Sequence, residues 1–178
     1  RVNTLKTTKE QLISSLKKEG VDVTDVEFLP NALNIDNTGS IENLTSFKNG
    51  EFYVQDSASQ LCCEMLDAKE NMTVCDVCSA PGGKSLYTAI KMNNKGKVYS
   101  YDLFEHKIKL IRHSAKRLSV DIINASVRDA QSCDSKLPMC DRLICDVPCS
   151  GFGIIRRKPE IRYKKATIVT PICKVSAE

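Results

Sequence analysis

The stretch MTVCDVCSAPGGK, residues 72–84, decides the fold that we predict for this chain. Residues 74–78 are apolar at four of five positions, which indicates a short buried strand. A turn of small residues follows, and then the first residue of a helical pattern: Ser79, Ala80, Pro81, Gly82, Gly83 and Lys84. Glycine lets the backbone approach a ligand, and a helix N-terminus offers unpaired N–H groups to it. This order is typical of a nucleotide-type site, although such a turn can also be only a tight connection.

Length and composition indicate a globular chain of one domain, or of one domain and a small appendage. The chain has 178 residues, of which 42% are hydrophobic and 27% are charged. It contains no apolar run as long as a membrane helix and no signal-peptide pattern, so we expect a cytoplasmic protein without a membrane partner. A net charge of +4 permits a polyanionic partner without requiring one. Because the first residue is Arg1, we expect the sequence to begin inside a longer chain.

Nine cysteines raise the question of disulfides and metals. Their odd number argues against a complete disulfide framework, and we interpret most of them as reduced, buried, small apolar residues. Cys75 and Cys78 form a C-x-x-C pair, but no second pair follows at zinc-ribbon spacing, and His106 and His113 are the only histidines. We therefore expect no metal.

The sequence divides into an N-terminal lobe, residues 1–53, and a second domain, residues 54–178. In the lobe we predict a strand over 1–5, a helix from Thr7 or Thr8 to about Glu19, a strand over 21–28, and a turn-rich stretch over 31–53. This pattern predicts a small α+β lobe, which can be a packing unit or an accessory surface for a large substrate.

The second domain alternates strands and helices. A helix from about Ser57 comes first; strands are predicted over 74–78, 97–103, 121–127 and 140–148, and helices over 83–93 and 105–118. Strands that alternate with helices form βαβ units with right-handed connections, so the fold class is α/β with a parallel sheet.

Three aspartates follow successive strands: Asp102, Asp129 and Asp146. Each alone is best explained as a cap or turn former, but parallel sheets bind ligands at the carboxyl ends of their strands, and three equivalent positions favour a binding edge. Asp102 lies 19 residues after Gly83, where an acid meets a ribose in nucleotide-binding units. The turn lacks the third glycine of G-x-G-x-x-G, so the residues leave open both a dinucleotide and S-adenosyl-L-methionine.

A cysteine follows the fourth strand in Pro148-Cys149. Cytosine C5 becomes nucleophilic when a thiolate adds at C6, so a cysteine beside a methyl-donor site suits methyl transfer to cytosine; a structural free cysteine is the alternative. Six basic residues lie among positions 156–165, beginning with Arg156, Arg157 and Lys158. They can hold RNA phosphates, or form a solvated basic loop.

These motifs together resemble a known family. DVCSAPGGK, the strand ends at Asp102 and Asp129, DVPCSGFGIIRRKPEIRY, RVNTLK and FYVQDSASQL are similar to the Sun-type (NOL/NOP/Sun) RNA cytosine-C5 methyltransferases, and most similar to the bacterial 16S ribosomal RNA enzymes. The resemblance extends from residue 1 to about residue 165.

The resemblance implies a Rossmann-like methyltransferase fold, S-adenosyl-L-methionine as cofactor and RNA, with ribosomal RNA as the expected target, as partner. The turn from Cys78 to Lys84 would contact the methionine part, Asp102 the ribose and Asp129 the adenine. Asp146 would lie near the methionine end and the target base, and the lobe would be RNA-binding-like. The oligomeric state is not indicated.

The chain departs from the family at its C-terminal end. In the family the nucleophile is the cysteine of a later Thr-Cys motif, which Cys173 does not match, while the Pro-Cys residue, here Cys149, assists product release. We therefore expect a methyltransferase domain that is incomplete after its fourth strand, with a tail after about Lys165 unlike the family's. A non-catalytic fragment that binds methyl donor or RNA is one alternative, and a dinucleotide-dependent oxidoreductase is the other.

Overall fold

The computed structural model describes residues 1–131, 137–147 and 159–163. The chain forms two compact units, Arg1–Ile144 and Cys145–Glu178. In the second unit the described elements comprise one short 3-10 helix, η3 (Pro159–Tyr163). The first unit contains the lobe and the sheet, and the two are described together below.

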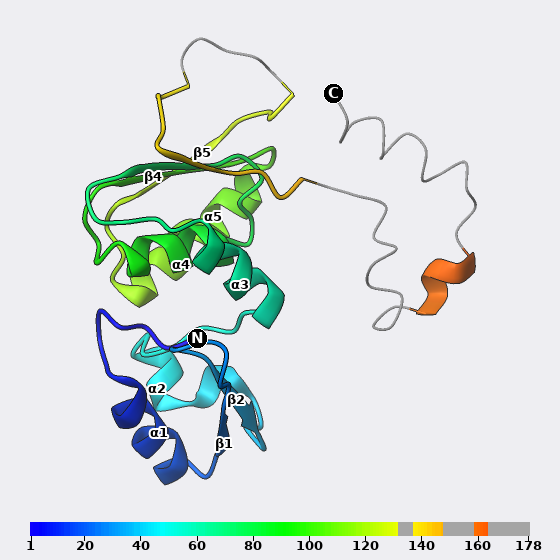
Figure 1. The fold of residues 1–178 in the computed structure, drawn as a ribbon. Helices are drawn as coiled ribbons and strands as arrows, with labels where there is room; N and C mark the ends of the chain where they lie inside the picture. The colour runs from blue at the N-terminus through cyan, green and yellow to red at the C-terminus, as the bar shows by residue number, and fades with distance from the viewer. Residues whose placement is uncertain (132–136, 148–158, 164–178) are drawn as a thin grey trace. The chain divides into compact units, whose positions relative to one another are not determined.

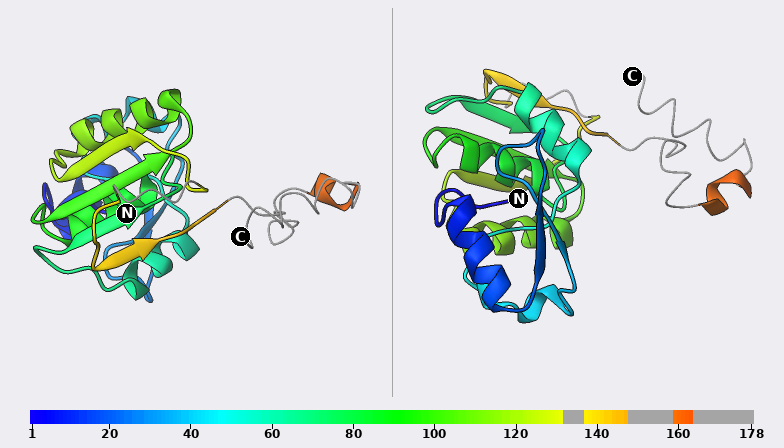
Figure 2. Two further views of the ribbon diagram at one scale, coloured as in Figure 1. Left: turned by 90° about the horizontal axis from the view of Figure 1, so that it is seen from above. Right: turned by 60° about the horizontal axis from the view of Figure 1, so that its bottom comes forward.

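A four-stranded parallel sheet lies at the centre of the first unit. Its strands are β3 (Thr73–Asp76), β4 (Lys97–Asp102), β5 (Ile123–Val127) and β6 (Arg142–Ile144), in the order β5-β4-β3-β6. Figure 2 (left) shows them side by side, with β5 and β6 at the two edges. The predicted parallel sheet is confirmed, but β6 is shorter than the predicted strand over 140–148 and ends two residues before Asp146.

Three helices cover one face of this sheet: α3 (Ser57–Met65), α4 (Gly83–Lys91) and α5 (Glu105–Leu118). Figure 1 shows them between the sheet and the lobe. The core beneath them joins Val74 and Val98 of the strands to Leu86, Ile90 and Leu118 of the helices, all nearly inaccessible to solvent. A fully buried side chain of this size contributes about 1.5–3 kcal/mol, so this apolar layer fixes the sheet on which the candidate site stands.

The lobe begins with α1 (Lys9–Lys18), whose N-terminus is closed by a capping box between Thr8 and Gln11. An antiparallel pair follows, β1 (Asp22–Asp25) with β2 (Leu33–Asp36), and then η1 (Ile41–Asn43) and α2 (Thr45–Lys48). The lobe is α+β as predicted, with three corrections. The strand over 1–5 is only an isolated bridge between Val2 and Phe52, the strand over 21–28 is four residues long, and the turn-rich stretch contains β2 and α2.

The short apolar segments of the turn-rich stretch form secondary structure because their side chains are buried in the core of the lobe. Leu33 and Ile35 of β2 pack on a cluster that contains Leu12 and Leu16 of α1. Strand β2 is therefore stabilised by tertiary burial rather than by a long alternating pattern.

The lobe is joined to the helical layer by side chains that bond backbone carbonyls; we call these contacts the joint. Asn3 donates to the carbonyls of Gly50 and Leu118, at 2.8 and 2.9 Å. Arg117 donates to the carbonyls of Phe47 and Phe52, and its guanidinium lies 3.9 Å from the centre of the Phe47 ring. Burial lowers the pKa of Arg117, because the charged guanidinium loses water there.

A second part of the joint involves α3 and α4. The guanidinium of Arg1 lies 4.1 Å from the centre of the Tyr87 ring. Tyr87 and Lys91 of α4 both donate to the carboxylate of Glu64 on α3. The lobe, α3 and α4 are therefore linked through one chain of polar contacts.

The six cysteines in the described part of the chain are less buried than we expected. Cys63 and Cys75 are buried and Cys78 is half-buried, while Cys62, Cys140 and Cys145 are exposed; all six are free. In the described part of the chain, no helix combines the length and the apolar character that a membrane crossing requires.

Candidate functional site

The glycine turn is fastened to the end of β4. The backbone N–H and the hydroxyl of Ser79 both donate to the carbonyl of Tyr101, each at 2.8 Å. The N–H of Ala80 donates to Oδ2 of Asp102 at 3.3 Å. The structure thus brings together two predicted parts of the site, the turn and the acid after the second strand.

Gly82 gives the turn its shape. It caps α4 with φ of 105°, a value that side chains rarely allow, and its N–H donates to the carbonyl of Ser79 at 2.7 Å. A Cβ at Gly82 would lie 3.2 Å from Cγ1 of Ile111 on α5. The turn therefore has both a backbone and a packing reason for glycine, and it presents the start of α4 to the carboxyl edge of the sheet.

Asp102 is 7% exposed and has donors around its carboxylate. Besides Ala80, the N–H of Phe104 lies 3.4 Å from Oδ1, and the ammonium of Lys107 forms an ion pair with the same oxygen at 3.4 Å. A carboxylate has about four lone-pair positions, so it retains capacity for a ligand hydroxyl. The sequence prediction missed Lys107, although its place one turn after the strand end was a signal.

A buried chain of polar side chains underlies the turn, and the sequence prediction missed it too. Ser100 of β4 donates to Ser85 of α4 at 2.8 Å, and Ser85 donates to Oδ2 of Asp76 at 2.7 Å. All three residues are at most 1% exposed. Asp76 was recognisable as the one charged residue of a buried strand, and the bonds fix the end of β3 and the first turn of α4 to β4.

Asp129 lies two residues beyond β5 and differs from Asp102. It is exposed, and its Oδ1 accepts from the N–H of Gln131 at 2.9 Å, a local turn bond. The neighbouring N–H of Arg128 donates to the carbonyl of Asp102 at 3.0 Å, so this segment passes beside the end of β4.

For the remaining predicted site residues, the structure gives the degree of burial or does not describe the residue. Cys78, Gly83 and Lys84 are half-buried, and Pro81 is exposed. Asp146 is exposed and belongs to the second compact unit. Cys149, Arg156, Arg157 and Lys158 lie outside the described residues.

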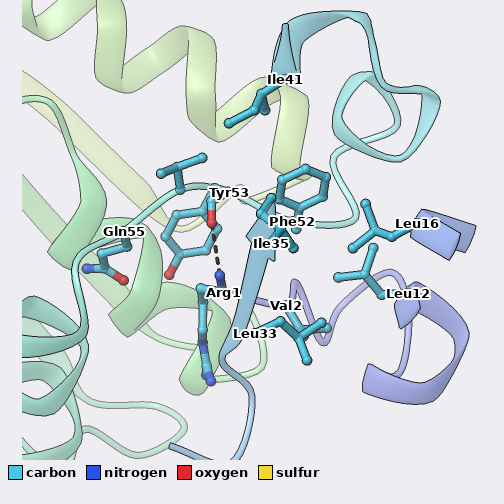
Figure 3. A pocket seen from close by; sticks show the side chains of 11 residues that line it. Arg1, Val2, Leu12, Leu16, Leu33, Ile35, Ile41, Phe52, Tyr53 and Gln55 are labelled. Carbon is cyan, nitrogen blue, oxygen red and sulfur yellow. Dashed lines mark hydrogen bonds between the residues drawn. The ribbon is translucent and has the colours of Figure 1, made fainter. Parts of the chain in front are cut away.

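A cavity of about 180 Å³ lies in the lobe rather than at the glycine turn. Figure 3 shows Leu12 and Leu16 at one end of it and Tyr53 and Gln55 at the other. None of the predicted site residues lines this cavity. Gln55 is the nearest link to the turn, because a Cβ at Gly83 would lie 3.4 Å from its Nε2.

The described buried thiols are poor nucleophiles. Burial raises the pKa of Cys63 to about 12 and that of Cys75 to about 11, so both are protonated at neutral pH. Over residues 1–131, 137–147 and 159–163, no three His, Cys, Asp or Glu side chains gather as a metal site would require.

The parallel sheet and the glycine turn that begins α4 are those of a Rossmann-like methyltransferase domain. The chain belongs to the 16S rRNA methyltransferase RsmB/F family, which it matches over residues 63–174; residues 1–42 match the ferredoxin-like domain of RsmF/B-like methyltransferases. The family resemblance predicted from the sequence is confirmed.

Relatives and solved structures agree with this assignment. The chain is 42% identical over 167 residues to a probable ribosomal RNA small subunit methyltransferase B of Bacillus subtilis. The aligned residues are 93% of this chain and 37% of the relative. The corresponding Synechocystis protein is 33% identical over 175 residues, 96% of this chain and 39% of the relative. The chain thus spans about two fifths of the length of these relatives.

Among solved structures, the crystal structure of PH0851 superposes with a TM-score of 0.91 at 32% identity, over 98% of this chain and 40% of that one. NSun6 from Pyrococcus horikoshii, solved with SFG, superposes with a TM-score of 0.84 over 98% of this chain and 68% of that one. At 21% identity, this second likeness bears on the fold alone.

Proposed function

We propose that this chain is the cofactor-binding part of an enzyme that transfers a methyl group from S-adenosyl-L-methionine to C5 of a cytosine in RNA, with 16S ribosomal RNA as the target. The observation that carries the proposal is the fastening of the glycine turn to a buried carboxylate at the end of the next strand. Family membership supports the same reaction.

Each predicted residue has a role in this proposal. The turn from Cys78 to Lys84 receives the methionine part, because its backbone can come close and α4 begins there. Asp102 accepts hydrogen bonds from the ribose hydroxyls, and the segment of Asp129 lies beside the adenine. Asp146 acts near the methionine end and the target base, and Arg156, Arg157 and Lys158 hold RNA phosphates.

The chemistry requires a thiolate. It adds to C6 of cytosine, the enamine carbon C5 takes the methyl group from the sulfonium, and loss of the C5 proton lets the C5–C6 double bond re-form and expels the thiolate. The buried thiols of Cys63 and Cys75 do not suit this step, since burial favours their protonated form. We assign Cys149 to release of the methylated product.

A dinucleotide-dependent oxidoreductase has less support. The turn lacks the third glycine of G-x-G-x-x-G, which lets the helix pack close to the strand in dinucleotide-binding units, and the family is one of methyltransferases.

Calorimetric titration with S-adenosylhomocysteine tests the proposal. We expect the wild-type chain to bind, and Asp102→Ala to weaken binding by about 1–3 kcal/mol, the scale of lost hydrogen bonds to a charged group. Asp121→Ala is the matched control: this exposed aspartate precedes β5 at the amino edge of the sheet, so affinity should not change. No binding of the wild-type chain at millimolar ligand, or binding of NAD in its place, would refute the proposal.

A further inference from the structure

The outer side of α5 carries basic side chains along its whole length. His106, Lys109, His113 and Lys116 are all exposed, and their spacing of three, four and three residues places them on one side of the helix. We call these four residues the α5 basic face. The buried residues Ile108, Ile111, Ala115 and Leu118 lie on the opposite side, against the sheet.

The two lysines of this face are not committed elsewhere. In the described part of the chain, neither Lys109 nor Lys116 has a hydrogen bond or an ion pair. Their basic neighbours differ: Arg112 pairs with Glu105 and donates to the carbonyl of Ala125, and Arg117 belongs to the joint. Charge on the basic face is therefore available to an outside partner.

The lobe does not supply such charge. Residues 1–53 contain six Lys and Arg against eight Asp and Glu, a formal charge of −2. Residues 54–144, which contain α5, have thirteen against eleven, a formal charge of +2, and residues 145–178 have seven against three, a formal charge of +4. A polyanion is therefore attracted to the second domain rather than to the lobe, and on α5 the exposed cations Lys109 and Lys116 alternate with His106 and His113 along one side.

The position of α5 relates its basic face to the candidate site. The helix starts three residues after Asp102, is 14 residues long and ends at the joint with the lobe. At 1.5 Å per residue it spans about 21 Å, enough for several nucleotides of a strand that enters the site.

We propose that the α5 basic face binds the sugar-phosphate backbone of the RNA substrate, an inference that rests on the proposed function. An acidic protein is a poorer match. Protein interfaces need an apolar centre, and within α5 Leu110 is the one large apolar side chain that is exposed. Phosphates need only flexible cations that release counterions on contact.

The test compares two double variants that remove the same charge. Lys109→Gln with Lys116→Gln alters the α5 basic face, and Lys17→Gln with Lys18→Gln alters exposed lysines at the end of α1. Binding of a fluorescently labelled single-stranded RNA of about 20 nucleotides is measured against salt concentration. We expect the α5 variant to reduce the slope of log Kobs against log salt by about 1.4, at about 0.7 per phosphate contact, and the α1 variant to leave it unchanged.

Titration with S-adenosylhomocysteine and circular dichroism accompany the RNA measurement, and both variants should match the wild-type protein in them. If the wild-type chain binds RNA and the α5 variant has the wild-type slope, the α5 proposal is wrong and the proposed function stands. If both variants lower the slope equally, the effect is one of general charge and the α5 proposal is also wrong. If the wild-type chain binds S-adenosylhomocysteine but no RNA, the RNA part of the proposed function fails together with it.

Discussion

The glycine turn and the joint are held by the same kind of bond but over very different spans of sequence. At the turn, Ser79 and Ala80 bond groups 22 residues away, at the end of the next strand. At the joint, Asn3 bonds a carbonyl 115 residues away, and Arg117 bonds one 70 residues away. A bond between neighbouring βαβ elements shapes a local site, whereas a bond across the chain fixes one part of the molecule on another.

This difference leads to separable effects. A change at the joint removes contacts between the lobe and the helical layer, so it should lower the free energy of unfolding and leave ligand affinity alone. A change at the turn alters the surface that the ligand meets, so it should lower affinity more than its effect on folding explains.

Arg117→Ala should produce the largest loss of stability. It removes two hydrogen bonds from a charged donor and the stacking on Phe47, together worth about 2–4 kcal/mol of unfolding free energy. Urea denaturation followed by circular dichroism measures the loss. Lys116→Ala, an exposed cation on the same turn of α5, should stay within about 0.5 kcal/mol of the wild-type protein. Equal stability of Arg117→Ala and Lys116→Ala would show that the joint does not stabilise the fold.

The same difference in span explains what sequence could predict. The glycine turn, Asp102 and the alternation of strands and helices around them follow from local spacing, since each βαβ unit repeats strand, turn and helix within a short stretch of the chain. Arg117 gave no such signal, because in the sequence it is one more basic residue of an amphipathic helix. The chain from Ser100 through Ser85 to Asp76 was missed for the same reason: its members belong to three elements, and only packing brings them together.

Gly82→Ala should have the next largest effect, and it acts on the site. Alanine at φ of 105° costs about 1–3 kcal/mol, and its Cβ would press on Ile111, so either Ile111 or the turn beside Asp102 must shift. We expect affinity for S-adenosylhomocysteine to fall at least about tenfold, measured by calorimetry at a temperature where the variant is folded.

Gly39→Ala separates strain from site geometry. Gly39 lies in the lobe with φ of 57°, and nothing stands within 4 Å of its missing Cβ. This substitution should cost stability alone, without any change in affinity. An affinity loss in both variants would mean that backbone strain anywhere weakens the site, and that the turn has no special role.

Glu64→Gln should have the smallest effect on stability, and the size of this effect should depend on pH. Burial opposes ionisation of Glu64, but hydrogen bonds from Lys91 and Tyr87 outweigh it and lower its pKa. A carboxyl whose pKa is lower in the folded state contributes stability above its unfolded pKa of about 4.3 and loses it as pH falls through the folded value. At pH 7 the variant should therefore be less stable than the wild-type protein by about 1 kcal/mol, and the difference should shrink below about pH 4.

Urea denaturation at both pH values measures this difference. Glu70→Gln, which removes a more exposed pair with Lys95, is the control and should show a smaller difference at each pH. A difference for Glu64→Gln that is constant from pH 7 to pH 3 would mean that its charge is not what links α3 to α4.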